Sequence, residues 1–111
     1  MKKINMLRKN KDFSFCYRKG RVINTKIFKL YYTSSKYNKR AGFSVSKKVG
    51  NSVVRNKMRR RMKESFDILL PQINKECSVI FVAKNDIVNV NFWDLHKTMK
   101  EALEKAKLMS E

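Results

Sequence analysis

Acidic residues are scarce in this sequence: 9 Asp and Glu stand against 27 Lys and Arg, for a formal net charge of +18 over 111 residues. Residues 13–63 contain no carboxylate side chain. A nuclease of the two-metal kind needs clustered carboxylates to hold its ions, so this scarcity argues against one. His96 is the only histidine, which excludes an acid–base pair of histidines, and no Walker or GxGxxG motif is present. We therefore expect no catalytic residue and no metal site in the polypeptide.

Cysteine, proline and glycine are also rare. Cys16 and Cys77 are too few and too distant for a disulfide framework or a zinc site, so we expect two reduced packing residues. The sequence has one proline and three glycines, at positions where turns or helix ends are expected. It shows no linker and no internal repeat. This organisation predicts a single domain over residues 1–111.

Long apolar runs are missing as well. No stretch reaches the roughly 18 apolar residues of a membrane-spanning helix. The basic start of the sequence lacks the apolar region of a secretory signal peptide. We therefore expect a cytoplasmic protein without a membrane span.

The positive charge that is present lies mostly in the first part of the chain. Residues 1–63 hold 21 basic side chains and one acid, whereas residues 64–111 hold 6 basic side chains and 8 acids. A field concentrated in this way attracts polyanions and releases their counterions on binding. Nucleic acid is the leading partner on this basis, and charge alone leaves a membrane surface as the second.

Periodicity and turn signals predict an α+β sandwich in which helices pack against a small sheet. The expected helices cover residues 10–19, 52–69 and a segment from Asn91 onward, and the expected strands cover residues 21–34, 40–48 and 77–83. The polar segment between the first two strand regions predicts an antiparallel hairpin. The continuous apolar run of residues 77–83 is typical of a strand covered on both faces.

Alternation within the strands assigns side chains to two faces. The expected core-facing set is Phe28, Leu30, Tyr32, Ala41, Phe43 and Val45. The expected outward-facing set is Ile27, Lys29, Tyr31, Thr33, Gly42, Ser44, Ser46 and Lys48. The apolar stripes expected on the last two helices are Val54, Met58, Met62, Phe66 and Leu69, then Phe92, Leu95, Met99, Ala102, Leu103 and Ala106.

The segment of residues 47–63 carries eight Lys and Arg among its seventeen residues and no acid. Like charges four residues apart, such as Arg55, Arg59 and Lys63, destabilise a helix. An external polyanion relieves that repulsion, so the segment predicts contact with RNA or DNA.

Aromatic residues give a second candidate surface. Phe13 and Tyr17 share one face of the first helix, and Tyr31 lies beside Lys29 on the outward face of a strand. Aromatic rings next to cations suit single-stranded nucleic acid, because its bases stack on the rings and its phosphates form ion pairs with the cations. A second small core between helix and sheet would use the same aromatic residues, and the sequence leaves both interpretations open.

The sequence around the basic helix resembles the bacterial ribonuclease P protein family. The family pattern is a strand ending in Ser44-Val45-Ser46-Lys47-Lys48, then Val49-Gly50-Asn51, then a helix with Arg55-Asn56 and a run of basic residues to Arg61. The resemblance covers roughly residues 6–105. It departs from the family at Lys57 and Lys63, where Arg is common, and at Tyr17, where Phe is common.

The resemblance implies an αβββαβα sandwich similar to the second domain of ribosomal protein S5, with a left-handed crossover through the helix of residues 52–69. It implies a subunit that binds the catalytic RNA of ribonuclease P and the precursor tRNA, and no DNA. The RNA would remove the 5′ leader of precursor tRNA with Mg²⁺ held mainly by RNA, and the protein would bind no cofactor of its own.

The resemblance also implies two sets of binding residues. The set for the catalytic RNA is Lys47, Lys48, Asn51, Arg55, Asn56, Lys57, Arg59, Arg60, Arg61 and Lys63. The set for the 5′ leader, in a cleft between the first helix and the sheet, is Phe13, Tyr17, Lys29, Tyr31, Ser44 and Ser46.

Three other functions compete with this interpretation. A ribosomal protein of the same fold would carry a similar basic surface. A DNA-binding regulator would place residues 52–63 in a groove, although the strands before this helix do not fit the short helix-turn-helix spacing. A protein nuclease is the third, and the missing carboxylates argue against it.

Overall fold

The structure is a computed structural model and describes residues 5–6, 10–35 and 39–109. The strands are β1 (Asn5–Met6), β2 (Arg21–Asn24), β3 (Phe28–Ser34), β4 (Arg40–Ser44) and β5 (Cys77–Ala83). The helices are α1 (Asn10–Lys19), α2 (Ser52–Leu69) and α3 (Phe92–Lys105), with the short 3-10 helices η1 (Leu70–Gln72) and η2 (Asn85–Asn89). The order agrees with the αβββαβα sandwich that the family resemblance implies, and adds the two-residue β1 before it.

Capping residues set the ends of the two longer helices. The Asn51 side-chain oxygen accepts a hydrogen bond of 3.0 Å from the N–H of Val54 at the start of α2. Asn91 caps α3 in the same way, with its oxygen 2.8 Å from the N–H of Asp94. α2 ends before Pro71, which cannot continue an α-helix. These local signals explain why the predicted range of α2 agrees with the structure.

The sheet has the order β1-β4-β5-β3-β2. β5 pairs in parallel with β4 and antiparallel with β3. The predicted antiparallel hairpin between the strands of residues 21–34 and 40–48 is therefore wrong, because β5 lies between them. Almost every residue of β5 is buried, and a strand of this composition buries most apolar surface at the centre of a sheet.

The hairpin in this part of the chain joins β2 to β3 instead. These strands pair antiparallel, with Asn24 opposite Lys29. The turn between them is held by Thr25, whose hydroxyl oxygen accepts a hydrogen bond of 3.0 Å from the N–H of Phe28. Ile27 lies in this turn and is 4% exposed in the main core. Its predicted outward position is wrong because the turn interrupts the strand alternation.

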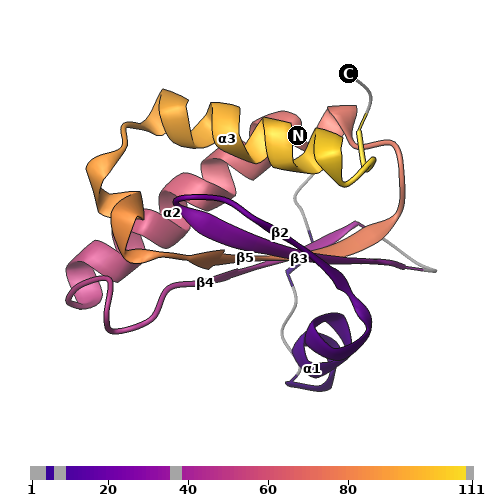
Figure 1. The fold of residues 1–111 in the computed structure, drawn as a ribbon, viewed down its shortest axis with the longest axis horizontal. Helices are drawn as coiled ribbons and strands as arrows, with labels where there is room; N and C mark the ends of the chain where they lie inside the picture. Colours follow the sequence, from indigo (N-terminus) through magenta and orange to yellow (C-terminus); the bar gives the residue numbers. More distant parts are fainter. Residues whose placement is uncertain (1–4, 7–9, 36–38, 110–111) are drawn as a thin grey trace.

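Helices cover both faces of the sheet: α2 and α3 lie on one face and α1 lies on the other (Figure 1). The main core fills the space between the sheet and α2 and α3, where the rings of Phe43, Phe66 and Phe81 contact one another. β4 and β5 are neighbouring parallel strands connected through α2. This connection is the strand–helix–strand crossover that the family resemblance implies.

Gly20 determines how α1 joins the sheet. A Cβ at this position would lie 2.3 Å from the carbonyl oxygen of Cys16 and 2.8 Å from that of Tyr32. Both contacts are with backbone atoms, which have little freedom to move away. The absence of a side chain at Gly20 therefore lets the chain leave α1 and enter β2 directly beside β3.

Candidate nucleic-acid interface

The face of the sheet that α1 partly covers, here called the α1 face, brings together residues from three strands. β-strand register places two rows of neighbours across β4, β5 and β3 on this face. The rows are Gly42, Ile80 and Tyr31, then Ser44, Val82 and Lys29. Two predicted leader-binding residues, Ser44 and Lys29, therefore stand on the same face with one strand between them.

Three predicted aromatic residues meet on the α1 face and form an aromatic cluster of Phe13, Tyr17 and Tyr31. The ring centroids of Tyr17 and Tyr31 are 4.8 Å apart at an interplanar angle of 82°. Those of Phe13 and Tyr17 are 6.5 Å apart. The cluster therefore joins α1 to β3, although its members lie far apart in the sequence.

The aromatic cluster includes the small core that one of the two interpretations predicts, and it also leaves ring surface exposed. Beneath the rings, Cys16 and Ile80 are fully buried and form a small core with Phe13 and Tyr31 packed against it. Tyr17 nevertheless remains 41% exposed, and Phe13 and Tyr31 are half-buried. Burial, followed by the neighbouring Tyr31, raises the pKa of the Tyr17 hydroxyl, so the group stays neutral at physiological pH. The cluster offers ring faces and edges rather than charge.

The polar members of the predicted leader set lie around this cluster. Lys29 is exposed on β3, and Ser44 is half-buried at the end of β4. Ser46 is exposed two residues beyond that strand. Sequence reasoning missed Val82, which stands between Ser44 and Lys29. No sequence signal separates it from the core-facing residues, because both faces of β5 are apolar.

The predicted residues for the catalytic RNA lie in the β4–α2 connection and on α2. The exposed members are Lys47, Lys48, Asn51, Asn56, Lys57, Arg60 and Lys63, and the half-buried members are Arg55, Arg59 and Arg61. Among the described residues, Lys63 pairs with Asp67 at 3.8 Å, and Arg59 donates a hydrogen bond to Asn56. No other member of the set has an ion pair within the described part of the chain.

Asn51 and Arg55 differ from the other members of this set in their surroundings. The side-chain oxygen of Asn51 caps α2, which leaves only its amide nitrogen free to donate elsewhere. The Nε of Arg55 is buried and has no hydrogen-bond acceptor among the described residues. A buried donor without a partner is unfavourable.

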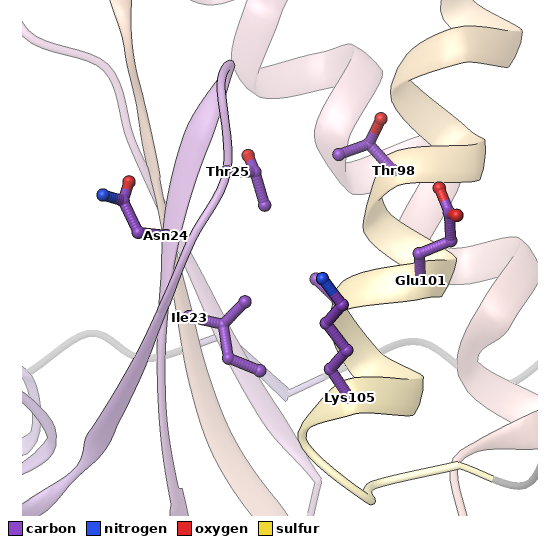
Figure 2. Close-up of a pocket in the computed structure, with 7 residues that line it drawn as sticks. Ile23, Asn24, Thr25, Thr98, Glu101 and Lys105 are labelled. Atoms are coloured by element: carbon purple, nitrogen blue, oxygen red, sulfur yellow. The ribbon is translucent and has the colours of Figure 1, made fainter.

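A small pocket between β2 and α3 has a volume of about 180 Å³. Its lining residues are Ile23, Asn24, Thr25, Thr98, Glu101, Ala102 and Lys105. Figure 2 shows the Lys105 side chain reaching from α3 toward this space, with Glu101 above it on the same helix. The polar groups of the lining are the carboxylate of Glu101, the amine of Lys105, the amide of Asn24 and the hydroxyls of Thr25 and Thr98.

The titratable side chains that resemble catalytic groups are structural. Cys16 and Cys77 are free and buried, and burial raises the pKa of both thiols to about 11. The thiols are therefore protonated at neutral pH and poor nucleophiles. His96 forms a hydrogen bond of 2.8 Å through Nδ1 with the hydroxyl of Ser65, which links α3 to α2.

No group of three His, Cys, Asp or Glu side chains that could hold a metal ion occurs within residues 5–6, 10–35 and 39–109. In the same part of the chain, no helix is both long and apolar enough to cross a membrane.

Comparisons with known proteins agree on one family. The family model described as Ribonuclease P matches residues 1–107. The ribonuclease P protein component of Alkaliphilus oremlandii is 36% identical over 111 residues, which cover 99% of this chain and 97% of that protein. The same component of Clostridium botulinum (strain Eklund 17B / Type B) is 41% identical over 113 residues, covering 95% of this chain and 90% of that protein.

Solved structures give the same result. The RNase P protein of Staphylococcus aureus superposes with a TM-score of 0.88 at 30% identity, covering 97% of this chain and 100% of that one. The RNase P protein of Thermotoga maritima superposes with a TM-score of 0.82 at 22% identity, covering 91% and 96%. At the lower identity the likeness shows the fold alone.

Proposed function

Because this chain belongs to the ribonuclease P protein family, we propose that it binds the catalytic RNA of ribonuclease P and the 5′ leader of precursor tRNA at the same time. In this role it assists the RNA in removing the leader in the cytoplasm. The observation that carries the proposal is the arrangement of two different surfaces. The basic helix α2 lies on one side of the sheet, and α1 lies on the other (Figure 1). α1 carries Phe13 and Tyr17 of the aromatic cluster.

α2 is the element proposed to contact the catalytic RNA. Its exposed cations have few partners within the described protein, so phosphate groups are the natural counterions. Arg55 adds a half-buried guanidinium to this surface. Arginine suits this position because its planar fork binds phosphate oxygens in pairs. Lys57 and Lys63 supply charge without that fork and contribute less directional contacts.

The α1 face is the surface proposed to bind the leader. Tyr17 and Tyr31 offer partly exposed rings on which unpaired bases can stack, and Lys29 supplies a cation for the adjoining phosphates. Ser44 and Ser46 supply hydroxyl groups at the end of β4. Stacking on rings requires no particular base, so this surface suits leaders of many sequences.

This arrangement explains how the protein would favour substrate over product. Precursor tRNA has a leader and mature tRNA has none, so contacts on the α1 face are available only to the precursor. Discrimination between two ligands requires contacts that only one of them makes. The basic surface of α2 also lowers the repulsion between two polyanions that must come together.

The chemistry is proposed to remain with the RNA. The described part of the protein offers no cluster of carboxylate, histidine or thiol ligands for a metal ion. No catalytic step is assigned to these residues. Mg²⁺ held mainly by RNA is the expected cofactor of the assembled enzyme.

The test is cleavage of a precursor tRNA by a bacterial ribonuclease P RNA at low Mg²⁺ concentration, with and without this protein. Protein alone is the control. Cleavage at the mature 5′ end only when both components are present supports the proposal. Cleavage by protein alone would show that the polypeptide itself is catalytic. Tight RNA binding without any stimulation would instead favour a ribosomal protein of the same fold.

A further inference from the structure

A second, larger pocket lies away from the predicted binding residues and has a volume of about 370 Å³. It is formed where the end of α1, the ends of β2 and β3, the segment before β5 and the end of α3 come together. Its lining residues are Lys19, Arg21, Tyr32, Thr33, Ser34, Lys75, Glu76, Lys105, Ala106, Lys107 and Leu108. None of these residues belongs to the sets predicted for the catalytic RNA or the leader.

The lining carries a strong positive charge. It contains five cationic side chains and one carboxylate, Glu76. None of the five cations forms an ion pair with another residue in the described part of the chain. Lys105 stands at the border with the smaller pocket, and its amine turns toward that side (Figure 2). The remaining four, from Lys19 to Lys107, still leave a clear excess of positive charge.

The walls of this pocket are fixed by the backbone. The N–H of Asn74 donates a hydrogen bond of 2.8 Å to the carbonyl oxygen of Leu108. The N–H of Ser35 donates one of 3.1 Å to the carbonyl oxygen of Glu76. These bonds hold the end of β3 and the segment after α3 to the segment before β5. The cations are therefore presented from a defined surface and not from a loose tail.

Lys107 has an unusual backbone conformation. Its φ angle is 60°, and it is the only non-glycine residue with positive φ in the described part of the chain. α3 ends there in a Schellman motif, in which the N–H of Leu108 bonds to the carbonyl of Leu103 and the N–H of Lys107 to that of Glu104. Glycine is favoured at this position because a side chain is strained. Backbone strain of this kind is common at functional sites, so the strained position of Lys107 suggests that its side chain has a binding role.

The pocket reaches the α1 face at Lys19 and Thr33, whereas Tyr32 and the end of α3 form its wall on the other side of the sheet. Thr33 and Tyr31 lie on the same face of β3, two residues apart, which corresponds to roughly 6–7 Å along a strand. Lys19 is the last residue of α1, and Tyr17 precedes it by two positions. A nucleic-acid strand stacked on Tyr31 would pass Thr33 at the end of β3 and turn around the end of the sheet to reach the cations of the pocket.

We propose that this pocket binds backbone phosphates of a single RNA strand that continues past the aromatic cluster toward the end of β3. The inference rests on the proposed function, because it extends the surface assigned to the leader. The lining fits phosphate better than a base or an apolar ligand, since the polar groups are mainly cations and the ring of Tyr32 packs against the main core. Lys19, Arg21, Lys75 and Lys107 are the phosphate-binding residues.

The test uses the full-length protein and single-stranded oligouridylates of increasing length, with no ribonuclease P RNA present. The variant is Lys19→Ala combined with Lys107→Gly. The control is Lys97→Ala combined with Lys100→Ala, which removes two charges from the exposed side of α3. We expect the wild-type protein to bind long oligomers more tightly than short ones. The variant should bind short oligomers as the wild-type protein does and should not gain affinity with length.

For two phosphate contacts on a single strand, the slope of log affinity against log salt should fall by about 1.4 in the variant. Lys107→Gly by itself should leave the melting temperature unchanged or raise it, because glycine removes the strain. Equal binding losses for short and long oligomers, or an equal loss in the control, would overturn the proposal. Because the assay contains no ribonuclease P RNA, failure here is distinct from failure of the proposed function.

Discussion

The ring of Tyr17 on α1 meets the ring of Tyr31 on β3 edge to face, with centroids 4.8 Å apart. This contact does two things. It helps to hold α1 against the sheet above the small buried pair of Cys16 and Ile80. It also leaves part of both rings at the surface, where unpaired bases can stack. Under the proposed function, stability and leader binding would depend on the same two side chains.

Replacing Tyr31 with alanine should weaken binding of precursor tRNA to the assembled enzyme and leave binding of mature tRNA unchanged. The expected loss is about 1–3 kcal/mol, the usual contribution of one base stacked on an aromatic ring. Phe13→Ala should act in the same direction. The measurement is the dissociation constant of each RNA with the reconstituted enzyme.

Phe15→Ala is the matched control for these variants. Phe15 is 48% exposed on α1 but makes no ring contact with the aromatic cluster. Its loss should not affect precursor binding. If Tyr31→Ala weakens binding of precursor and mature tRNA equally, the leader does not occupy the α1 face.

Arg60→Ala should weaken assembly with the catalytic RNA, and the effect should shrink as salt rises. Arg60 is exposed on α2 and has no ion pair with a described residue. Loss of one phosphate contact should reduce the salt slope of binding by about 1. Lys97→Ala removes an exposed charge from α3 and should change neither the affinity nor the slope. An unaltered slope for Arg60→Ala would argue against a phosphate contact there.

Gly20→Ala should lower the free energy of unfolding by about 1–3 kcal/mol, as expected for an atom forced into occupied space. The added Cβ would overlap the carbonyl oxygens of Cys16 and Tyr32. Relief of that overlap requires α1 to move from β3, so precursor binding should fall as well. Ser14→Ala, at an exposed position of α1, should leave stability nearly unchanged. Urea unfolding followed by circular dichroism makes the comparison.

The protein should become less stable as the pH falls below neutrality, in part through His96. Burial, and then the charge of Lys100, lowers the pKa of His96 below its usual value. The unfolded chain therefore takes up a proton at a higher pH than the folded chain. The stabilisation is fully present above the unfolded pKa of about 6.5 and is lost as pH falls toward the folded pKa.

Urea unfolding above and below this pH measures the effect, and His96→Gln should remove this part of the pH dependence. The variant also tests the hydrogen bond to Ser65, which lies between α2 and α3. An identical pH dependence in the wild-type protein and the variant would show that His96 does not contribute.

Local signals were sufficient to predict the helices. Asn51 at the start of α2 and Pro71 beyond its end act through the backbone of their immediate neighbours, and Gly20 marks the end of α1. The predicted ranges 10–19 and 52–69 therefore agree with the structure. The strand boundaries were predicted less well because the turn at Thr25 divides residues 21–34 into two strands.

The order of the strands could not be obtained in this way. The hairpin expected between β3 and β4 would have satisfied the local turn signals, but β5 inserts between them. Pairing with both neighbours buries the two apolar faces of β5 at once. This gain in buried apolar surface requires β5 to pair with β4, although the two strands are more than thirty residues apart in the sequence. No local sequence pattern encodes such a pairing.

The sequence by itself determined the helices, the separation of charge along the chain and the basic character of α2, because these depend on neighbouring residues and composition. It also carried the family resemblance. Only the tertiary structure decided that Phe13 and Tyr17 meet Tyr31, and that a basic pocket forms around Lys19 and Lys107. The physical reason is that these groups are brought together by burial of Cys16 and Ile80 beneath α1 and by docking of the end of α3 on the sheet, both of which are non-local contacts.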